Sequence, residues 1–192
     1  MTDISLLIGA YIIGSFPTAY LCAKAFRKMD IRHTGTGNMG AANAYRSKGL
    51  LPGLITLGLD ILKGALAVGI AQRFGHAQGL SVLAGVLVIF AHNFNVFLGF
   101  KGGKGLASLV GILIVLSPET IPIVFLFLFI LVRLLRDKNI AAGLAAMSFP
   151  FLFWVQHGQW QSAVSGGLIL APVLVKYAGD FRVFFGQRRD HV

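Results

Sequence analysis

A glycine-rich polar segment at residues 33–46 is the first part of this sequence that could bind a phosphorylated molecule. It reads HTGTGNMGAANAYR, so glycines alternate with small polar residues before an arginine. Glycine allows positive φ and a close backbone approach, and successive N–H groups can then converge on phosphate oxygens. Thr36 and Asn38 add donors, and the Arg46 guanidinium can bind two oxygens at once. We interpret the segment as an anion-binding loop, with a sharp turn between two helices as the alternative.

A second glycine-rich segment, residues 92–105, reads HNFNVFLGFKGGKG and carries Lys101 and Lys104 at the edge of an apolar stretch. It predicts a second phosphate-contacting loop. It is not a Walker A motif, because Leu106 follows where Ser or Thr would bind magnesium, so no nucleotide is indicated. The alternative is an interfacial loop whose lysines meet lipid headgroups. A lone His92 is more typical of a hydrogen-bonded buried imidazole than of a catalyst.

Two further polar features lie inside apolar stretches. Asp60 and Lys63 are three residues apart, so on a helix they share a face and can pair. Charges at membrane depth are typical of functional sites, and a structural ion pair or a lysine that extends to the membrane interface is the alternative interpretation. Ser15 and Pro17 interrupt the first apolar stretch, where a freed carbonyl has to be buried against protein or a water-lined cavity. A simple helix kink is the alternative interpretation.

The elements that position these residues are apolar runs. Hydrophobic residues make up 56% of the chain, charged residues only 12%, and the mean hydropathy is +0.76, which together indicate a lipid environment. A membrane helix needs about 20 apolar residues. Seven runs approach that length, the fourth being the shortest: residues 4–26, 50–70, 80–100, 106–116, 121–135, 140–155 and 163–177.

The distribution of positive charge predicts the orientation. With seven spans and the N-terminus outside, sixteen of the 17 Lys and Arg residues lie at the cytoplasmic face and only Arg73 lies outside. Both glycine-rich segments are then cytoplasmic, as is the C-terminus. We expect an all-α polytopic protein with residues 1–192 as a single membrane-embedded domain. The net charge of +10 is scattered between apolar runs, which favours an anionic membrane surface or substrate and argues against nucleic acid.

The motifs taken as a set resemble the PlsY family of acyl-phosphate:glycerol-3-phosphate acyltransferases. The resemblance covers about the first 117 residues in order and spacing, and it is specific as a set of motifs. It implies a seven-helix enzyme of the bacterial cytoplasmic (inner) membrane that transfers a fatty acyl group from acyl phosphate to the sn-1 hydroxyl of glycerol 3-phosphate. The product would be lysophosphatidate, and no metal or other cofactor is implied. The motifs are Gly14-Ser-Phe-Pro17 with Tyr20, Arg32, Gly35 to Asn43 with Arg46, Asp60 with Lys63-Gly64, and Phe100 to Gly105.

The chain departs from this family pattern in its second half. Residues 136–142 read RDKNIAA, so Asn139 and Ala142 stand where the family has serines. Tyr177 and Asp180 stand where it has His and Asn. A carboxylate at position 180 would repel a phosphate unless a nearby cation, such as Lys176 or Arg182, offsets it.

The predicted site therefore combines the residues of both loops with the buried charges. Its predicted substrates are acyl phosphate and glycerol 3-phosphate, with the acyl chain entering laterally between helices, and membrane lipid is a predicted partner. Two alternatives remain open: a paralogue with another acceptor or without catalysis, and a small transporter of phosphorylated metabolites. The predicted catalytic residues are Arg46, Lys104, His92 and Asp60, and the predicted substrate contacts are Ser15, Thr36, Gly37, Asn38, Gly40, Asn43, Lys101, Gly102, Gly103 and Asn139.

Overall fold

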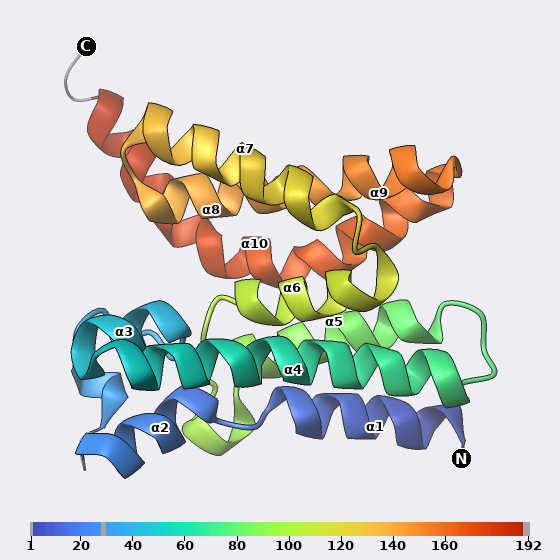
Figure 1. The fold of residues 1–192 in the computed structure, drawn as a ribbon, viewed down its shortest axis with the longest axis horizontal. Helices are drawn as coiled ribbons and strands as arrows, with labels where there is room; N and C mark the ends of the chain where they lie inside the picture. The colour runs from blue at the N-terminus through green and yellow to red at the C-terminus, as the bar shows by residue number, and fades with distance from the viewer. Residues whose placement is uncertain (1, 28–29, 190–192) are drawn as a thin grey trace.

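A computed structural model describes residues 2–27 and 30–189, and all of its regular elements within those ranges are helices (Figure 1). The predicted all-α class is therefore confirmed. The elements are α1 (Asp3–Gly14), α2 (Thr18–Arg27), η1 (Ile31–His33), α3 (Ala41–Lys48), α4 (Leu50–Phe74), α5 (Leu80–Asn93), η2 (Val96–Leu98), α6 (Leu106–Leu116), α7 (Thr120–Leu135), α8 (Lys138–Met147), α9 (Phe149–His157) and α10 (Trp160–Arg189).

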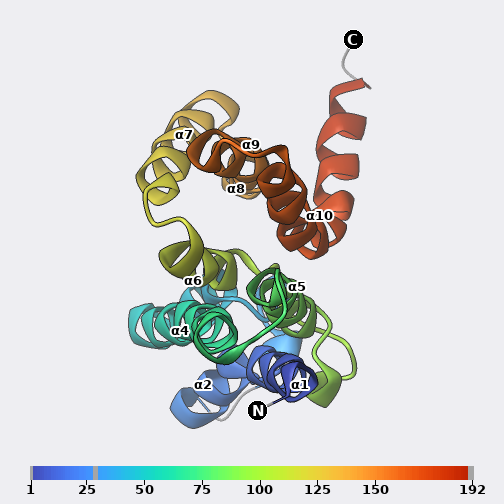
Figure 2. The same cartoon turned by 90° about the vertical axis from the view of Figure 1, so that its right-hand side faces the viewer.

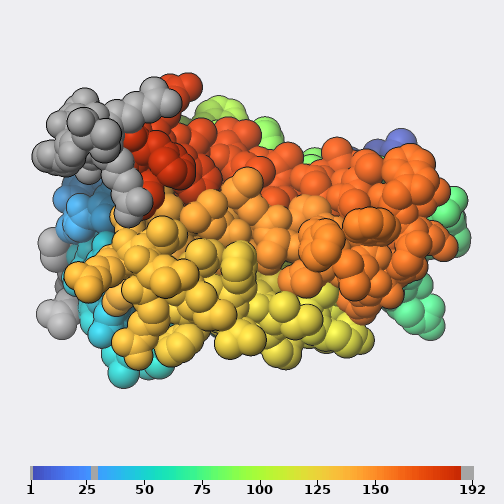
Figure 3. Space-filling view, turned by 90° about the horizontal axis from the view of Figure 1, so that it is seen from above, coloured from blue at the N-terminus to red at the C-terminus, as the bar shows by residue number. Residues whose placement is uncertain are grey.

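The outer surface of the bundle is apolar. Among the 16 residues of α7 only Thr120 is buried, whereas Phe129 is 59% and Leu134 is 72% exposed. The face formed by α7, α8, α9 and α10 is seen in Figure 3. Soluble proteins rarely expose contiguous apolar surface on this scale. Lipid is the solvent in which this surface is stable.

Four helical segments are long and apolar enough to cross a membrane: 3–26, 50–74, 80–98 and 138–157. The first contains α1 and α2 and the last contains α8 and α9, each joined at a break. Two more apolar helices, α6 and α7, are shorter, and α10 has 30 residues with Pro172 inside it. These lengths support a multi-pass membrane protein, and the count of seven spans stays a prediction.

The break between α1 and α2 exposes two backbone carbonyls inside the bundle. Helix α1 ends at Gly14 and α2 begins at Thr18, and Pro17 between them has no N–H to continue the helical hydrogen bonds, so the carbonyls of Ser15 and Phe16 lie in a break without i→i−4 partners. The Asn95 side-chain amide donates to the Ser15 carbonyl at 2.6 Å, and Lys63 Nζ donates to the Phe16 carbonyl at 3.4 Å. The expected burial of this break against protein is therefore observed.

The short helix α6 packs directly on α4. A Cβ on Gly64 of α4 would overlap the Ser108 carbonyl of α6, and one on Gly111 of α6 would overlap the Ile61 carbonyl of α4. Only glycine permits such a close approach of two helix backbones. In lipid no hydrophobic effect drives helices together, so the dispersion contacts that this close approach creates stabilise the pair. The 11-residue α6 is therefore shielded by its neighbours rather than surrounded by lipid.

The helices form two layers. In Figure 1, α1, α2, α4 and α5 make the lower layer and α7, α8 and α9 the upper layer, with α6 and α10 between them; Figure 2 gives the end-on view. The ends of α2, α7 and α10 lie at the same end of the bundle as α3 and the start of α8. The start of α1 and the α4–α5 turn lie at the opposite end. Segments that are far apart in the sequence therefore lie at the same end of the bundle.

Candidate active site

A polar cavity of about 300 Å³ lies at the end of the bundle where α3, the loop before α6 and the start of α8 meet. Helices α4, α5 and α10 contribute the remaining polar wall. Residues of both glycine-rich segments line it, so the structure brings the two predicted loops together. The polar side chains that line the cavity belong to Asn38, Arg46, Asp60, His92, Lys104, Lys138, Asn139 and Tyr177.

Asn43 organises the first loop. Its side chain is buried, and its amide nitrogen donates to the carbonyls of Thr34 at 3.0 Å and Asn38 at 2.9 Å. Its amide oxygen accepts the Thr36 N–H at 3.0 Å. Gly37 has φ +68°, a conformation that costs glycine little. These bonds fold the loop back onto the start of α3 and fix the backbone that faces the cavity.

The predicted contacts from this loop separate into two groups. Asn38, Gly40 and Arg46 line the cavity. Thr36 is exposed and does not line it, and its hydroxyl accepts the Asn38 N–H at 3.4 Å. Asn43 has its amide engaged by the loop itself. A substrate contact by Thr36, Gly37 or Asn43 stays a prediction, whereas the position of Arg46 fits its predicted role.

An ion pair next to this loop does not reach the cavity. Arg32 Nη2 lies 2.6 Å from Asp30 Oδ2, and the side chains are 34% and 29% exposed. The hydrogen bond from Arg32 stabilises the carboxylate and lowers the pKa of Asp30 to about 2. Asp30 therefore stays ionised at neutral pH.

In the second loop, Lys104 faces the cavity and Lys101 does not. Lys104 Nζ lies 2.5 Å from Asp180 Oδ2 and 4.5 Å from the centre of the Tyr177 ring, both residues of α10. Lys101 is exposed outside the cavity, so its predicted substrate contact stays a prediction. Asp180 therefore pairs with Lys104 itself, whereas the sequence analysis named Lys176 or Arg182 as the cations that could offset its charge.

The two glycines between these lysines pack closely on α5. The Gly103 N–H donates to the His92 carbonyl at 3.2 Å, and a Cβ at Gly103 would overlap the His92 ring. Gly102 lines a small neighbouring cavity together with Lys63 and His92. Both glycines thus place the loop against His92, and direct contact between them and substrate stays a prediction.

Asp60 is the centre of a buried polar network. Its Oδ1 lies 2.8 Å from Lys63 Nζ and accepts the Thr18 hydroxyl at 2.5 Å, so the predicted pairing of Asp60 with Lys63 is confirmed. His92 Nδ1 lies 3.8 Å from the same oxygen, beyond hydrogen-bond distance. All four side chains are buried. No group of three or more His, Cys, Asp and Glu side chains gathers within residues 2–27 and 30–189.

The start of α8 adds a cation that sequence reasoning had not selected. The Asp137 carboxylate caps this helix by accepting the N–H groups of Asn139 at 2.8 Å and Ile140 at 3.1 Å. Lys138 and Asn139 both line the cavity. Only Asn139 was predicted to contact substrate. The sequence could have indicated Lys138 as a cavity residue, because Lys138 is one of the positive residues predicted to lie at the same membrane face as the two loops.

Ser15, also predicted as a contact, is buried at the α1–α2 break and does not line this cavity.

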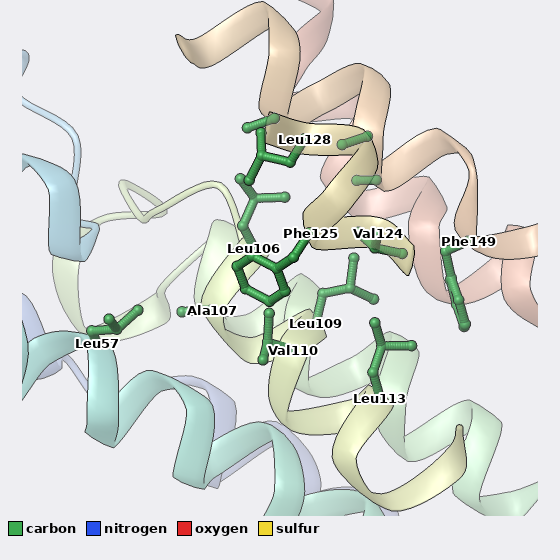
Figure 4. A pocket seen from close by; sticks show the side chains of 13 residues that line it. Leu57, Leu106, Ala107, Leu109, Val110, Leu113, Val124, Phe125, Leu128 and Phe149 are labelled. Carbon is green, nitrogen blue, oxygen red and sulfur yellow. The ribbon is translucent and has the colours of Figure 1, made fainter. Parts of the chain in front are cut away.

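An apolar groove of about 200 Å³ adjoins the polar cavity (Figure 4). Its walls come from α4, α6, α7, α8 and the start of α9, and they include Leu128 and Phe149. The groove and the polar cavity share four lining residues: Leu57, Leu106, Ala107 and Ala142. The site therefore combines a cationic polar end with an apolar channel wall.

Comparison with known proteins identifies the family. The family model described as glycerol-3-phosphate acyltransferase matches residues 4–185. The chain belongs to this family of acyltransferases. It is 39% identical over 170 residues to glycerol-3-phosphate acyltransferase 2 of Dehalococcoides mccartyi strain CBDB1, covering 88% of this chain and 81% of that one. It is 40% identical over 154 residues to glycerol-3-phosphate acyltransferase 2 of Moorella thermoacetica, and the match covers 80% of this chain and 79% of that one.

Solved structures of family members have the same fold. The chain matches the glycerol 3-phosphate form of PlsY (YgiH), an integral membrane glycerol 3-phosphate acyltransferase, with a TM-score of 0.86 and 29% identity over 96% of this chain and 92% of that one. The match to the lysophosphatidic acid form of the same protein has a TM-score of 0.84 and 28% identity, with the same coverage of both chains. The predicted family resemblance is confirmed, and residues of both loops that carried it line the polar cavity.

Proposed function

We propose that this acyltransferase moves a fatty acyl group from acyl phosphate to the sn-1 hydroxyl of glycerol 3-phosphate, giving lysophosphatidate for phospholipid synthesis. The observation that carries the proposal is the junction of the polar cavity with the apolar groove at Leu57, Leu106, Ala107 and Ala142. An acyl phosphate is apolar along its chain and dianionic at its head. The junction supports its binding with the chain in the groove and the head among the cations.

The cations of the cavity have the chemistry to bind two phosphates. The Arg46 guanidinium is a planar fork that binds two phosphate oxygens at once, whereas Lys104 and Lys138 act as point charges. Asn38 and the Gly40 backbone add polar groups beside Arg46. We assign phosphate binding to these residues, and to Asp60 and His92 the task of holding α2, α4 and α5 in place around the cavity.

The reaction needs no nucleophile from the protein, because acyl phosphate is already activated. The sn-1 hydroxyl oxygen attacks the carbonyl carbon, and the bond from that carbon to the phosphate oxygen breaks. In the overall balance the hydroxyl proton ends on the released inorganic phosphate. The protein then acts by aligning the two substrates and stabilising the charge on the departing phosphate. Arg46 and Lys104 supply that positive charge.

The cavity is proposed to open to the cytoplasm of a bacterial cell, at the inner membrane. Two features support this orientation: the excess of Lys and Arg at the cavity end of the chain's apolar runs, and the position of the start of α1 at the opposite end of the bundle from the end of α10 (Figure 1). An odd number of crossings, seven by the sequence pattern, puts the two termini on opposite faces.

The direct test uses purified protein in detergent or in vesicles. With both acyl phosphate and glycerol 3-phosphate, lysophosphatidate and inorganic phosphate should form in equal amounts, and omission of either substrate should abolish both products. Release of phosphate with another alcohol but not with glycerol 3-phosphate would instead support an altered acceptor. Uptake of glycerol 3-phosphate into sealed vesicles without acyl transfer would support a transporter.

A further inference from the structure

The Lys104 ammonium is occupied by a carboxylate of the protein itself. Asp180 Oδ2 lies 2.5 Å from Lys104 Nζ, and the two residues are 76 positions apart in the chain. Asp180 lies on α10 one helical turn after Tyr177, whose ring lies 4.5 Å from the same nitrogen. The contact therefore holds a cation of the cavity between two side chains of the last helix.

The other two cations of the cavity have no such partner. Neither Arg46 nor Lys138 pairs with a carboxylate in the part of the chain that the structure describes. Lys104 is thus the cation whose charge is neutralised before substrate arrives. The charge that the cavity offers to a phosphate depends on whether Asp180 remains in contact with Lys104.

We infer that Asp180 is an affinity-determining residue, which competes with the phosphate of the substrate for the Lys104 ammonium. The inference rests on the proposed function, since it assigns substrate phosphate to this cavity. A phosphate bound at Lys104 would lie within a few ångströms of the Asp180 carboxylate, and like charges at that distance repel. Phosphate binding therefore requires either that the Asp180 side chain turns away from Lys104 or that the phosphate interacts more weakly with the Lys104 ammonium.

The exposure of the pair fits displacement by substrate. The side chains of Lys104 and Asp180 are 21% and 34% exposed, so water and a small anion can reach them. Ion pairs with this degree of exposure are weak, and salt screens them. A carboxylate in such a pair lowers the affinity for phosphate without blocking the site.

Asp180→Asn removes the charge and keeps the size of the side chain. The KM for glycerol 3-phosphate should fall roughly two- to fivefold while kcat changes less than KM, in keeping with an exposed pair. The gain should shrink as salt rises from about 0.05 to 0.5 M, because screening weakens the repulsion that the substitution removes. Asp180→Ser, which is also neutral, should reproduce the gain.

Asp30→Asn is the matched control. It removes one carboxylate from an ion pair of similar exposure that does not line the cavity, and an asparagine can still accept the Arg32 N–H. Its KM should equal that of the unmodified protein. An equal fall in KM for Asp30→Asn would mean that net charge alone is responsible, and would overturn the inference. An unchanged or higher KM for Asp180→Asn, or a collapse of kcat, would also overturn it.

A second readout separates this inference from the proposed reaction. Inorganic phosphate should raise the thermal unfolding temperature of the detergent-solubilised protein, with half-maximal effect at a lower concentration for Asp180→Asn than for the unmodified chain. This measurement needs no turnover. Tighter phosphate binding in a protein that makes no lysophosphatidate would leave the inference standing and refute the reaction, whereas normal turnover with unchanged phosphate affinity would refute the inference alone.

Discussion

The Lys63 ammonium lies 2.8 Å from the Asp60 carboxylate, and the two side chains are only 6% and 1% exposed. Each partner also reaches the break between α1 and α2: Lys63 donates to the Phe16 carbonyl, and Asp60 accepts the Thr18 hydroxyl. This buried ion pair on α4 thus bonds to one backbone carbonyl and one side-chain hydroxyl at the break in the first apolar segment. Its charges compensate each other only while both are present.

Removing one member of this pair should destabilise the fold. Lys63→Met or Asp60→Leu leaves an uncompensated buried charge, which typically costs about 3–5 kcal/mol. Thermal unfolding in detergent should occur at a clearly lower temperature for each single variant. The double variant removes both charges and should recover part of the loss. A double variant as unstable as the sum of the two singles would contradict the account.

Arg46→Ala and Lys104→Ala should each reduce acyl transfer by roughly 10- to 150-fold without unfolding the protein. Each removes a charge-assisted contact to phosphate, worth roughly 1.5–3 kcal/mol. Arg46→Lys should restore only part of the activity, because lysine lacks the planar fork. Arg133→Ala is the control, since Arg133 is exposed outside the cavity over the Phe129 ring. The measurement is lysophosphatidate formation, and near-normal turnover in both alanine variants would refute the phosphate-binding role.

Ala142→Leu should impair the use of long acyl chains. Ala142 lines both the polar cavity and the apolar groove, so a larger side chain narrows their junction. KM should rise several-fold for a long-chain acyl phosphate and little for acetyl phosphate. Ala171→Leu adds the same volume at an exposed position of α10 and should change neither value. Equal effects on long and short donors would place the acyl chain outside the groove.

Asn43→Ala should loosen the first loop. The Asn43 amide makes three hydrogen bonds to the loop backbone, and each is worth about 0.5–1.5 kcal/mol. Amide hydrogen exchange should become faster at residues 34–38, and KM for glycerol 3-phosphate should rise. Ser47→Ala, which removes only a side-chain contact to Asn43, should have the smaller effect. Unchanged exchange in Asn43→Ala would mean that the loop is held by other contacts.

The membrane orientation can be measured with single cysteines. In a Cys22→Ser background, a cysteine at Gly186 should react with a membrane-impermeant thiol reagent only from the cytoplasmic side. A cysteine at Gln78, in the exposed α4–α5 turn, should react only from outside. Each unlabelled protein, re-tested after the membrane is opened, serves as its own control. The reverse pattern would place the cavity outside the cell.

The sequence contained enough information for the membrane class and the two loops. Long apolar runs have no stable state in water, so their number and length indicated an all-α membrane protein. Glycines in the segments that carry Arg46 and Lys104 predicted anion-binding loops, because glycine permits a close backbone approach to phosphate oxygens. The structure brings both segments to one cavity, and phosphate binding there stays a prediction. The i, i+3 spacing of Asp60 and Lys63 was sufficient to predict their pairing, since it is set by helix geometry alone.

Contacts between distant segments were decided by the tertiary structure. The hydrogen bond from Asn95 to Ser15 joins residues 80 positions apart, and the Lys104–Asp180 pair joins residues 76 positions apart. No local sequence pattern specifies either contact. The sequence by itself determined which residues have the charge and backbone freedom to bind phosphate. Packing of α6 against α4 and of α8 against α10 decided which of these residues share one cavity and where it meets the apolar groove, because helix crossings bring side chains together irrespective of their separation along the chain.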